Sequence, residues 1–425
     1  MKKTLYAFLA LSLIKISSNA QEITKRCYTT EKYQEAVAEN PKILSIQEQL
    51  ELFTDNYIQN ENTESRNIIT IPVVVHVIYR TAAQNTTMTD TRIQNQINIL
   101  NRDFNGTNAD TNLTPAPFKP LRGNAQVNFC LAQRDPQGFM TNGITRTQTT
   151  ISNIGNTNNY FSTANGGIDA WDRTKYLNIW VCEIGSGILG FAYLPGTASA
   201  DRDGVVIDLK YFGTPGATSP YNLGRTATHE VAHWLNLRHI WGDTNCGTDL
   251  VTDTPTQQSD NGGCPTFPHR PNSCSTTNAN GDMFSNYMDY VNDNCMNIFT
   301  AGQVTRMRAA LNATAGGRNQ LQNSQGCVPG TPPPASIAEY VLYNRVRTYP
   351  NPAQNILNIE FPMHINSFDE ITVYDLVGNT IVKINKGEIQ NNQHGIDISK
   401  LSPGTYVIIA NTTYGILTNK FIVVK

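Results

Sequence analysis

Three of the chain's seven histidines lie within eleven residues, from His229 to His239. His229 and His233 are four positions apart. On a helix, both side chains would therefore project from one face, one turn apart, as two ligands of a single metal ion must. Glu230 would reach the open position of that metal without binding it, which suits a general base acting on a water molecule. The spacing predicts a helix that carries two ligands and the base of a catalytic zinc site.

The third ligand of this site has to come from elsewhere in the chain. One plan used by zinc peptidases takes it from a glutamate on a later helix, but the chain has no Glu between Glu230 and Glu339. His239 is then the expected third ligand, and the chain must turn sharply to bring it back to His233. Asn236 lies at that turn, and Asn is one of the few residues besides Gly that accept a left-handed backbone at modest cost.

Two other interpretations of the histidine cluster are chance and a closed structural zinc site. By chance, the pattern would arise about once in ten thousand such sequences. A closed structural zinc site would need a fourth protein ligand, usually Cys, and would leave Glu230 without a role. A catalytic zinc explains the segment better than either.

The histidine segment resembles the long zinc-binding motif of the metzincin peptidases, and residues 67–325 resemble the pappalysin family, which includes ulilysin. The family normally carries Gly where Asn236 stands, a departure that Asn can accommodate. The stretch Asn286-Tyr287-Met288-Asp289-Tyr290 is similar to the family's Met-containing turn. The resemblance implies that Met288 forms the floor of the zinc site and that the Tyr290 hydroxyl stabilises the tetrahedral intermediate.

The resemblance also implies a reaction. Zinc would lower the pKa of its bound water toward neutrality, and Glu230 would take the proton as that water attacks a peptide carbonyl. Residues 187–193 resemble the family's edge strand, which binds the substrate main chain by strand addition, although a surface hairpin is the other interpretation. We expect a secreted zinc endopeptidase that is made as a zymogen and acts on proteins or peptides. The alternative is a catalytically retired binding or adhesion protein on the same scaffold, against which the intact Glu230 and Tyr290 argue.

The elements around this site predict an α+β fold. A β-branched run from Ile71 to Tyr79 is typical of a strand buried on both faces. Apolar residues recur at spacings of four, three and four from Ile93 to Phe104, which predicts an amphipathic helix ending near Gly106. Further strands are predicted at residues 127–132, 177–183 and 204–209. This order favours a metzincin-type mixed sheet with backing and active-site helices. His76, within the first strand, is expected to be a core residue rather than a ligand.

The N-terminus and the composition indicate an exported protein. Residues 1–20 have two lysines, an apolar run and small residues before a cut at Gln21, as in a secretory signal peptide. A membrane anchor would need about 20 apolar residues, and Lys15 interrupts the run before that, so no membrane span is expected. The 32 basic and 34 acidic residues give a charge of 32 − 34 = −2, without the basic clusters that nucleic-acid binding needs.

Residues 21–66 are polar, rich in Glu and partly helical, and the resemblance implies that they form a propeptide. A propeptide thiolate can occupy zinc's fourth position, and family members use such a cysteine switch, for which Cys27 is the candidate. Arg66 is the expected activation cut. The alternatives for Cys27 are a free thiol or a disulfide to one of the cysteines that the sequence leaves unpaired, which are Cys130, Cys182 and Cys327.

Four further cysteines cluster in a loop-rich stretch after the zinc motif. Four cysteines allow three pairings, and the resemblance favours Cys246–Cys274 and Cys264–Cys295. A zinc knuckle held by all four thiolates is the competing interpretation, which an exported protein with such wide spacings disfavours.

Two acidic positions near these cysteines are candidate binding residues. Asp249 and Asp253 place hard oxygen donors at short spacing, as a calcium site requires, although a turn with solvated carboxylates is the other interpretation. The resemblance implies calcium here. It also implies that Asp293 or Asn294 lines the pocket for the residue after the scissile bond, where an Asp selects Arg or Lys.

A Pro-rich linker is predicted at residues 326–340, followed by a small antiparallel β-sandwich at residues 341–425. This tail resembles the C-terminal sorting domain of type IX secretion, in blocks that occur in order and end at the terminus. They are Tyr349–Pro352, Val373–Gly378, Leu401–Tyr406 and Lys420–Lys425. The resemblance implies the type IX machinery as a partner and a secreted or surface-attached location. A carbohydrate-binding or adhesive sandwich is the rival interpretation.

Overall fold

The computed structural model describes residues 25–60, 67–332, 346–360, 368–385, 393–412 and 415–425. The expected signal peptide and Arg66 lie outside these ranges. The helices are α1 (Thr29–Glu39), α2 (Lys42–Asn60), α3 (Ala82–Thr87), α4 (Asp90–Phe104), α5 (Arg225–Trp234) and α6 (Ala301–Asn312). The strands of the first sheet are β1 (Lys25–Cys27), β2 (Ile69–Tyr79), β3 (Val127–Leu131), β4 (Ile144–Gln148), β5 (Leu177–Cys182), β6 (Ile188–Ala192) and β7 (Val205–Asp208).

These seven strands form one mixed sheet in the order β1-β6-β7-β5-β2-β3, with β4 also paired to β2. The pairs β7–β5, β5–β2, β2–β3 and β2–β4 are parallel, whereas β6 runs antiparallel to β7. The strand β1 comes from the segment expected to be a propeptide, and it pairs in parallel with β6. The expected α+β fold with a mixed sheet is confirmed.

Strand β2 is buried along most of its length, as its β-branched sequence predicts. On one face of the sheet its side chains pack with those of α4 and α5, and the α4 positions Ile93, Ile97, Leu100 and Phe104 all lie in this core. His76 is fully buried in β2, and its ring contacts Thr145 Oγ1 at 2.7 Å and Asn178 Oδ1 at 3.0 Å. His76 is therefore a hydrogen-bonded core residue, as expected.

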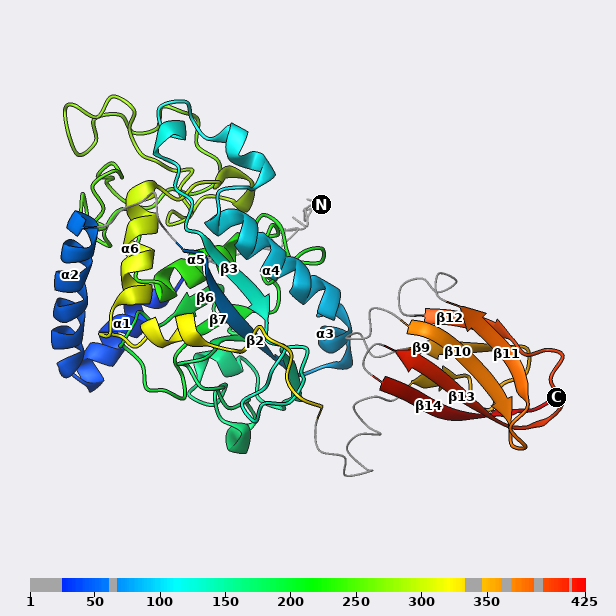
Figure 1. The fold of residues 1–425 in the computed structure, drawn as a ribbon. Coiled ribbons are helices and arrows are strands. Elements are labelled where there is room, and N and C mark those ends of the chain that lie inside the picture. The colour runs from blue at the N-terminus through cyan, green and yellow to red at the C-terminus, as the bar shows by residue number, and fades with distance from the viewer. Residues whose placement is uncertain (1–24, 61–66, 333–345, 361–367, 386–392, 413–414) are drawn as a thin grey trace, which may run out of the picture.

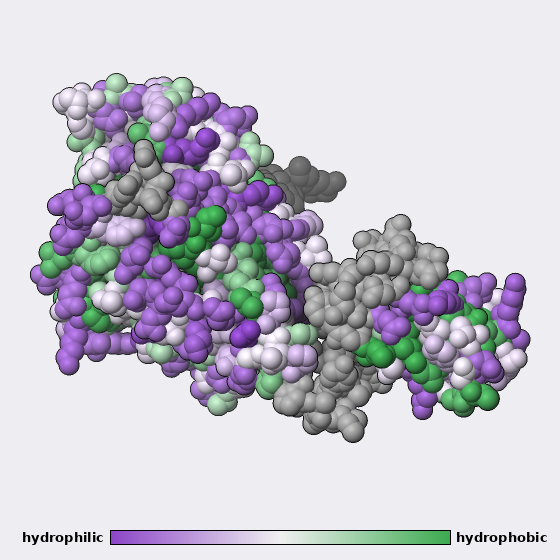
Figure 2. Space-filling view, in the orientation of Figure 1, coloured by the Kyte–Doolittle hydropathy of each residue, from purple (hydrophilic) through white to green (hydrophobic). Residues whose placement is uncertain are grey.

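The N-terminal helices lie against the domain that carries the large sheet. Figure 1 shows α1 and α2 in blue, with α2 running alongside α6. None of the helices within the described residues is long and apolar enough to cross a membrane. Figure 2 shows a mainly hydrophilic face with scattered apolar areas, consistent with a surface carried largely by neutral polar residues.

The tail forms two antiparallel sheets. Their strands are β8 (Arg347–Tyr349), β9 (Ile356–Glu360), β10 (Phe368–Asp375), β11 (Thr380–Asn385), β12 (Gln393–Asp397), β13 (Gly404–Thr412) and β14 (Gly415–Val423). One sheet has the order β11-β10-β13-β14 and the other β12-β9-β8. Residues from both sheets share a second apolar core. The expected β-sandwich is present, with strands longer than the short runs visible in the sequence.

Candidate active site

Helix α5 carries His229, Glu230 and His233, and all ten of its residues are buried. The helix ends at Trp234, and Asn236 then adopts φ = 72°, the left-handed backbone expected at this turn. This turn reverses the chain and brings His239 back to the two histidines of the helix. The spacing argument for the three residues therefore matches the geometry.

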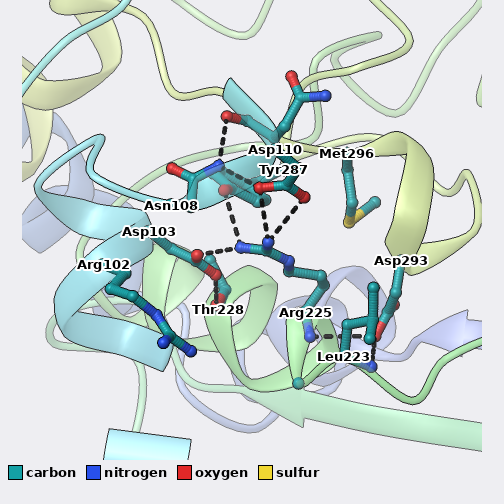
Figure 3. Close-up of polar contacts among 12 residues, drawn as sticks. Arg102, Asp103, Asn108, Asp110, Leu223, Arg225, Thr228, Tyr287, Asp293 and Met296 are labelled. Carbon is teal, nitrogen blue, oxygen red and sulfur yellow. Dashed lines mark hydrogen bonds and ion pairs between the residues drawn. The ribbon is translucent and has the colours of Figure 1, made fainter. Parts of the chain in front are cut away.

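The start of α5 is fixed by a buried ionic network. The Arg225 guanidinium contacts the carboxylates of Asp103 and Asp110 and the hydroxyl of Tyr287, as Figure 3 shows. Thr228 donates to the other oxygen of Asp103 at 2.6 Å. Since Asp103 belongs to α4 and Tyr287 to the Met-containing turn, the network ties the active-site helix to both neighbours.

In each of the three histidine rings, Nδ1 forms a hydrogen bond with an oxygen atom of the protein. These acceptors are Tyr287 O at 2.7 Å for His229, Leu237 O at 2.8 Å for His233 and Asp243 Oδ1 at 2.6 Å for His239. An Nδ1–H that donates to oxygen leaves the lone pair of a neutral ring on Nε2. Burial lowers the pKa of His233 to about 3 and holds the pKa of His229 well below 6.5, so both rings are neutral.

The three Nε2 atoms converge on one point. The Nε2 of His233 lies 3.1 Å from the Nε2 of His229 and 3.1 Å from that of His239. Two nitrogens on a tetrahedral zinc would be separated by about 3.3 Å, given bonds of roughly 2.0–2.1 Å. The Sγ of Cys27 joins this group, and the four candidate ligand atoms lie within 4.8 Å of one another. The residues therefore fit a zinc ion with three imidazoles and a thiolate.

Glu230 is fully buried beside the histidines. Its Oε2 accepts hydrogen bonds from Thr29 Oγ1 at 3.0 Å and from Cys27 Sγ at 3.3 Å. Its Oε1 has no hydrogen-bond partner among the described residues. Burial raises the pKa of Glu230 to about 8 in this covered state. An unpartnered carboxylate oxygen next to the ligand cluster is available to a water molecule.

The Met-containing turn lies against the same site. Met288 is completely buried, and its carbonyl accepts a hydrogen bond from Ile240 N at 3.3 Å. The Tyr290 hydroxyl lies 3.1 Å from the Nε2 of His239, and burial raises the pKa of Tyr290 well above its ordinary value. The hydroxyl is therefore protonated near neutral pH and able to donate a hydrogen bond within the site.

The N-terminal segment enters the site as an added strand. Cys27 pairs with Gly190 of β6, and Ala192 N donates to Thr29 Oγ1 at 2.9 Å. The side chain of Arg26 is buried, its NH2 group contacts Asp293 Oδ1 at 3.2 Å, and its guanidinium lies 4.9 Å from the Tyr221 ring centroid. Asp293 and Asn294 are the two candidates for the pocket that binds the residue after the scissile bond. Of these two, Asp293 is the one that contacts Arg26.

Comparisons with known proteins agree with this geometry. Residues 163–312 match the model of the M43 peptidases, described as pregnancy-associated plasma protein-A. An extracellular metalloprotease of Verticillium alfalfae is 32% identical over 253 residues, covering 56% of this chain and 77% of the relative. Another from Podospora anserina is 33% identical over 275 residues, covering 62% of this chain and 81% of the relative. The chain belongs to the pappalysin family of metalloproteases.

Solved structures and the tail extend this result. A mutant of Tannerella forsythia promirolysin is 43% identical, with a TM-score of 0.64, covering 72% of this chain and 100% of that one. Mature mirolysin with a cleaved peptide is 49% identical, with a TM-score of 0.57, covering 61% and 97%. Residues 347–424 match a secretion system C-terminal sorting domain. The protein is thus a secreted zinc metalloendopeptidase, found outside the cell or at its surface.

The cysteines of this metalloprotease are divided between bridges and free thiols. Disulfides join Cys246 to Cys274 and Cys264 to Cys295, and a third joins Cys130 to Cys327. The third bridge pairs two of the cysteines that the sequence left open. Cys27 and Cys182 are buried free thiols.

The two candidate calcium residues have different partners. Asp249 is buried and accepts from Val251 N and Thr254 Oγ1, and burial raises its pKa to about 6. The Asp253 carboxylate accepts from Thr300 Oγ1 at 2.6 Å and from Gly302 N at 2.8 Å, at the start of α6. Both carboxylates are thus hydrogen-bonded within the protein, and Asp253 caps the start of α6.

Sequence reasoning missed three residues of the site. Asp243, which orients His239, lies four residues after it, and that spacing is a signal that could have found it. Arg26 and Thr29 flank Cys27, and their contacts with Asp293 and Glu230 span more than 200 positions. No local pattern encodes such distant partners.

Proposed function

We propose that His229, His233 and His239 hold the catalytic zinc and that Glu230 is the general base of peptide hydrolysis. The observation that carries this assignment is the convergence of three Nε2 lone pairs, each fixed by an Nδ1 hydrogen bond. Zinc bound there would supply Lewis-acid activation of a water molecule. Glu230 would take the proton of that water and pass it to the leaving amine.

Tyr290 and Met288 have supporting roles in this proposal. The protonated Tyr290 hydroxyl would donate a hydrogen bond to the oxyanion that develops on the substrate carbonyl. Its contact with His239 Nε2 places it at the ligand cluster. Met288 would form the apolar floor under the histidines, in keeping with its complete burial.

Residues 21–66 would keep the enzyme latent. Cys27 Sγ would take zinc's fourth position as a thiolate, and the Thr29 hydroxyl would occupy the base by donating a hydrogen bond to Glu230. The segment also fills the free edge of β6, where strand addition would otherwise align a substrate. A cut near Arg66 followed by departure of the segment would open the site.

The pocket around Asp293 would select Arg or Lys after the scissile bond. Support comes from Arg26, whose buried guanidinium meets a carboxylate that is itself fully buried. A buried charge is favourable only with a paired opposite charge, so a neutral side chain would leave Asp293 without its partner. We extend this preference from the propeptide arginine to substrates.

The assignment of the base is tested with Glu230→Ala. The variant and the wild type are freed of residues 21–66, loaded with zinc and assayed on casein. Loss of a general base removes a factor of about 10²–10⁴ in rate, and bound zinc measured in the same samples should stay at the wild-type level. Unchanged cleavage would end the assignment, and loss of zinc would point to a structural defect instead.

Two further features belong to the proposal. Calcium would bind the loop at Asp249, with the Thr254 hydroxyl nearby. Calcium should therefore raise the melting temperature of the wild type and of the control Asp260→Asn, whose position is exposed, but not that of Asp249→Asn.

The sandwich of residues 341–425, after the linker at 326–340, would engage the type IX secretion machinery. Its match to a sorting domain supports this partner.

A further inference from the structure

Helix α2 of the pro-segment has its own docking surface, away from the zinc ligands. Its buried positions follow spacings of four, three and four, and they are Ile43, Gln47, Leu50 and Thr54. Gln47 donates to Pro195 O at 2.7 Å, and Leu50 is fully buried. This stripe packs α2 against α6 of the protease domain. The apolar stripe and this hydrogen bond thus attach α2 to the protease domain.

An ion pair lies beside this stripe. The Glu51 carboxylate binds the Arg306 guanidinium through both oxygens, with contacts of 2.7 and 2.5 Å. The Arg306 side chain, on α6, is only 1% exposed, whereas Arg238 is 39% exposed and contacts the same carboxylate at 3.6 Å. Two guanidiniums of the protease domain thus share one carboxylate of the pro-segment. A bidentate contact of this kind, between a nearly buried guanidinium and a carboxylate that is 22% exposed, is among the stronger forms of ion pair.

Arg306 also contacts the turn between the zinc ligands. Its Nε donates to the Asn236 carbonyl at 2.9 Å, and Asn236 is the left-handed residue between His233 and His239. When Glu51 leaves, Arg306 keeps this bond but loses the only carboxylate that contacts it among the described residues. With α2 in place the Arg306 guanidinium is nearly buried, so the Glu51 carboxylate supplies its counter-charge in the docked state.

We propose that Arg306 and Arg238 form a carboxylate-binding site on the mature protease and that its ligand is Glu51 of the cleaved pro-segment. Cutting the chain between residues 60 and 67 breaks no contact of this site, so the cut segment stays bound by α2. Activation then requires a second event that removes or degrades α2. The inference rests on the proposed function only in taking residues 21–66 to be cleaved from the protease.

The test measures retention of the cut segment without relying on catalysis. The full chain carries Glu230→Ala, to prevent self-cleavage, and Cys27→Ala, to remove the thiolate from the zinc site. Residues 61–66 are replaced by the recognition sequence of a site-specific protease. After complete cutting, the dissociation rate of the segment is followed by size-exclusion chromatography at successive times. Three chains are compared, one with Glu51, one with Glu51→Gln and one with Glu48→Gln, whose position is exposed on the same helix.

The segment should co-elute with the protease when Glu51 is present and in the Glu48→Gln control. Glu51→Gln should accelerate its dissociation by roughly 30-fold, as loss of the counter-charge of a nearly buried guanidinium does. Arg238→Gln, a change on the half-exposed protease side, should accelerate it by several-fold and provides a second variant if Glu51→Gln misfolds. Equal dissociation rates for Glu51→Gln and Glu48→Gln would overturn the proposal. So would release of the unaltered segment immediately after cutting.

Discussion

Asp293 uses its two carboxylate oxygens for different partners. Oδ1 faces Arg26 in the pocket, while Oδ2 accepts from Leu223 N at 2.9 Å and Arg225 N at 3.1 Å, at the start of α5 (Figure 3). An acidic group is stabilised at a helix N-terminus by the helix dipole and the free N–H groups. The residue proposed to select the substrate is thus fixed by the helix that carries the zinc ligands.

At the residue scale we predict that Asp293→Asn changes selectivity. Asn preserves an oxygen for the α5 amides but removes the charge that an incoming guanidinium needs. The kcat/KM of the mature enzyme for a peptide with Arg after the scissile bond should fall by about 10²-fold, as loss of a buried charge partner implies. A matched peptide with Leu at that position serves as the control. A parallel fall for both peptides would assign Asp293 a purely structural role.

The active-site helix depends on elements that are not sequence neighbours. Helix α5 packs on β6 and β7 and against α4, and its first residue lies in the network of Asp103 and Asp110. Strand β2 lies in the interior of the sheet, between β5 and β3, and His76 is its only histidine. Burial lowers the pKa of His76 to about 4.

At the element scale this shift predicts an acid-dependent loss of stability. The ordinary pKa of His is about 6.5, so between pH 6.5 and 4 the unfolded chain binds a proton that the folded chain does not. The free energy of unfolding should therefore fall as the pH falls through this window, by up to about 3 kcal/mol from His76 alone. Denaturant unfolding of wild type and His76→Gln at pH 7 and pH 4.5 measures it. An identical pH slope in both proteins would contradict the assignment.

The sequence alone predicts helix α4, strand β2 and the zinc motif, because the residues that define each of them lie close together in the chain. An apolar spacing of four, three and four, a β-branched run and a pair of histidines at four positions are local patterns. The contacts of Arg26 with Asp293 and of Glu51 with Arg306 join residues 267 and 255 positions apart. Such pairs depend on the folded arrangement of the propeptide, which no local pattern contains.

The molecule combines the protease domain, the segment proposed to be its propeptide and the C-terminal sandwich. Among the described residues, the protease core and the sandwich core share no member, so each domain buries its own apolar surface. The pro-segment instead packs directly on the protease domain. Its strand β1 pairs with β6 at the edge of the large sheet, and its helix α2 packs against α6. Removing the sandwich should therefore affect the protease far less than removing the pro-segment before folding.

At the scale of the molecule we predict that a chain ending at residue 332 retains peptidase activity but is not exported to the cell surface or medium. After removal of residues 21–66, its kcat/KM should stay within about two-fold of that of the full chain, since distant and unconnected sites behave additively. Cell fractionation in a host with type IX secretion measures export. Normal export of the shortened chain would show that the tail is not the sorting signal.

Crystals of the purified zymogen, measured at the zinc absorption edge, test the central claim most directly. Anomalous scattering locates zinc independently of catalysis. We predict one zinc ion in the protease domain at about 2.0–2.3 Å from the Nε2 atoms of His229, His233 and His239 and from the Sγ of Cys27. A zinc position away from these atoms, or a His239 ring outside bonding range of the ion, would contradict it.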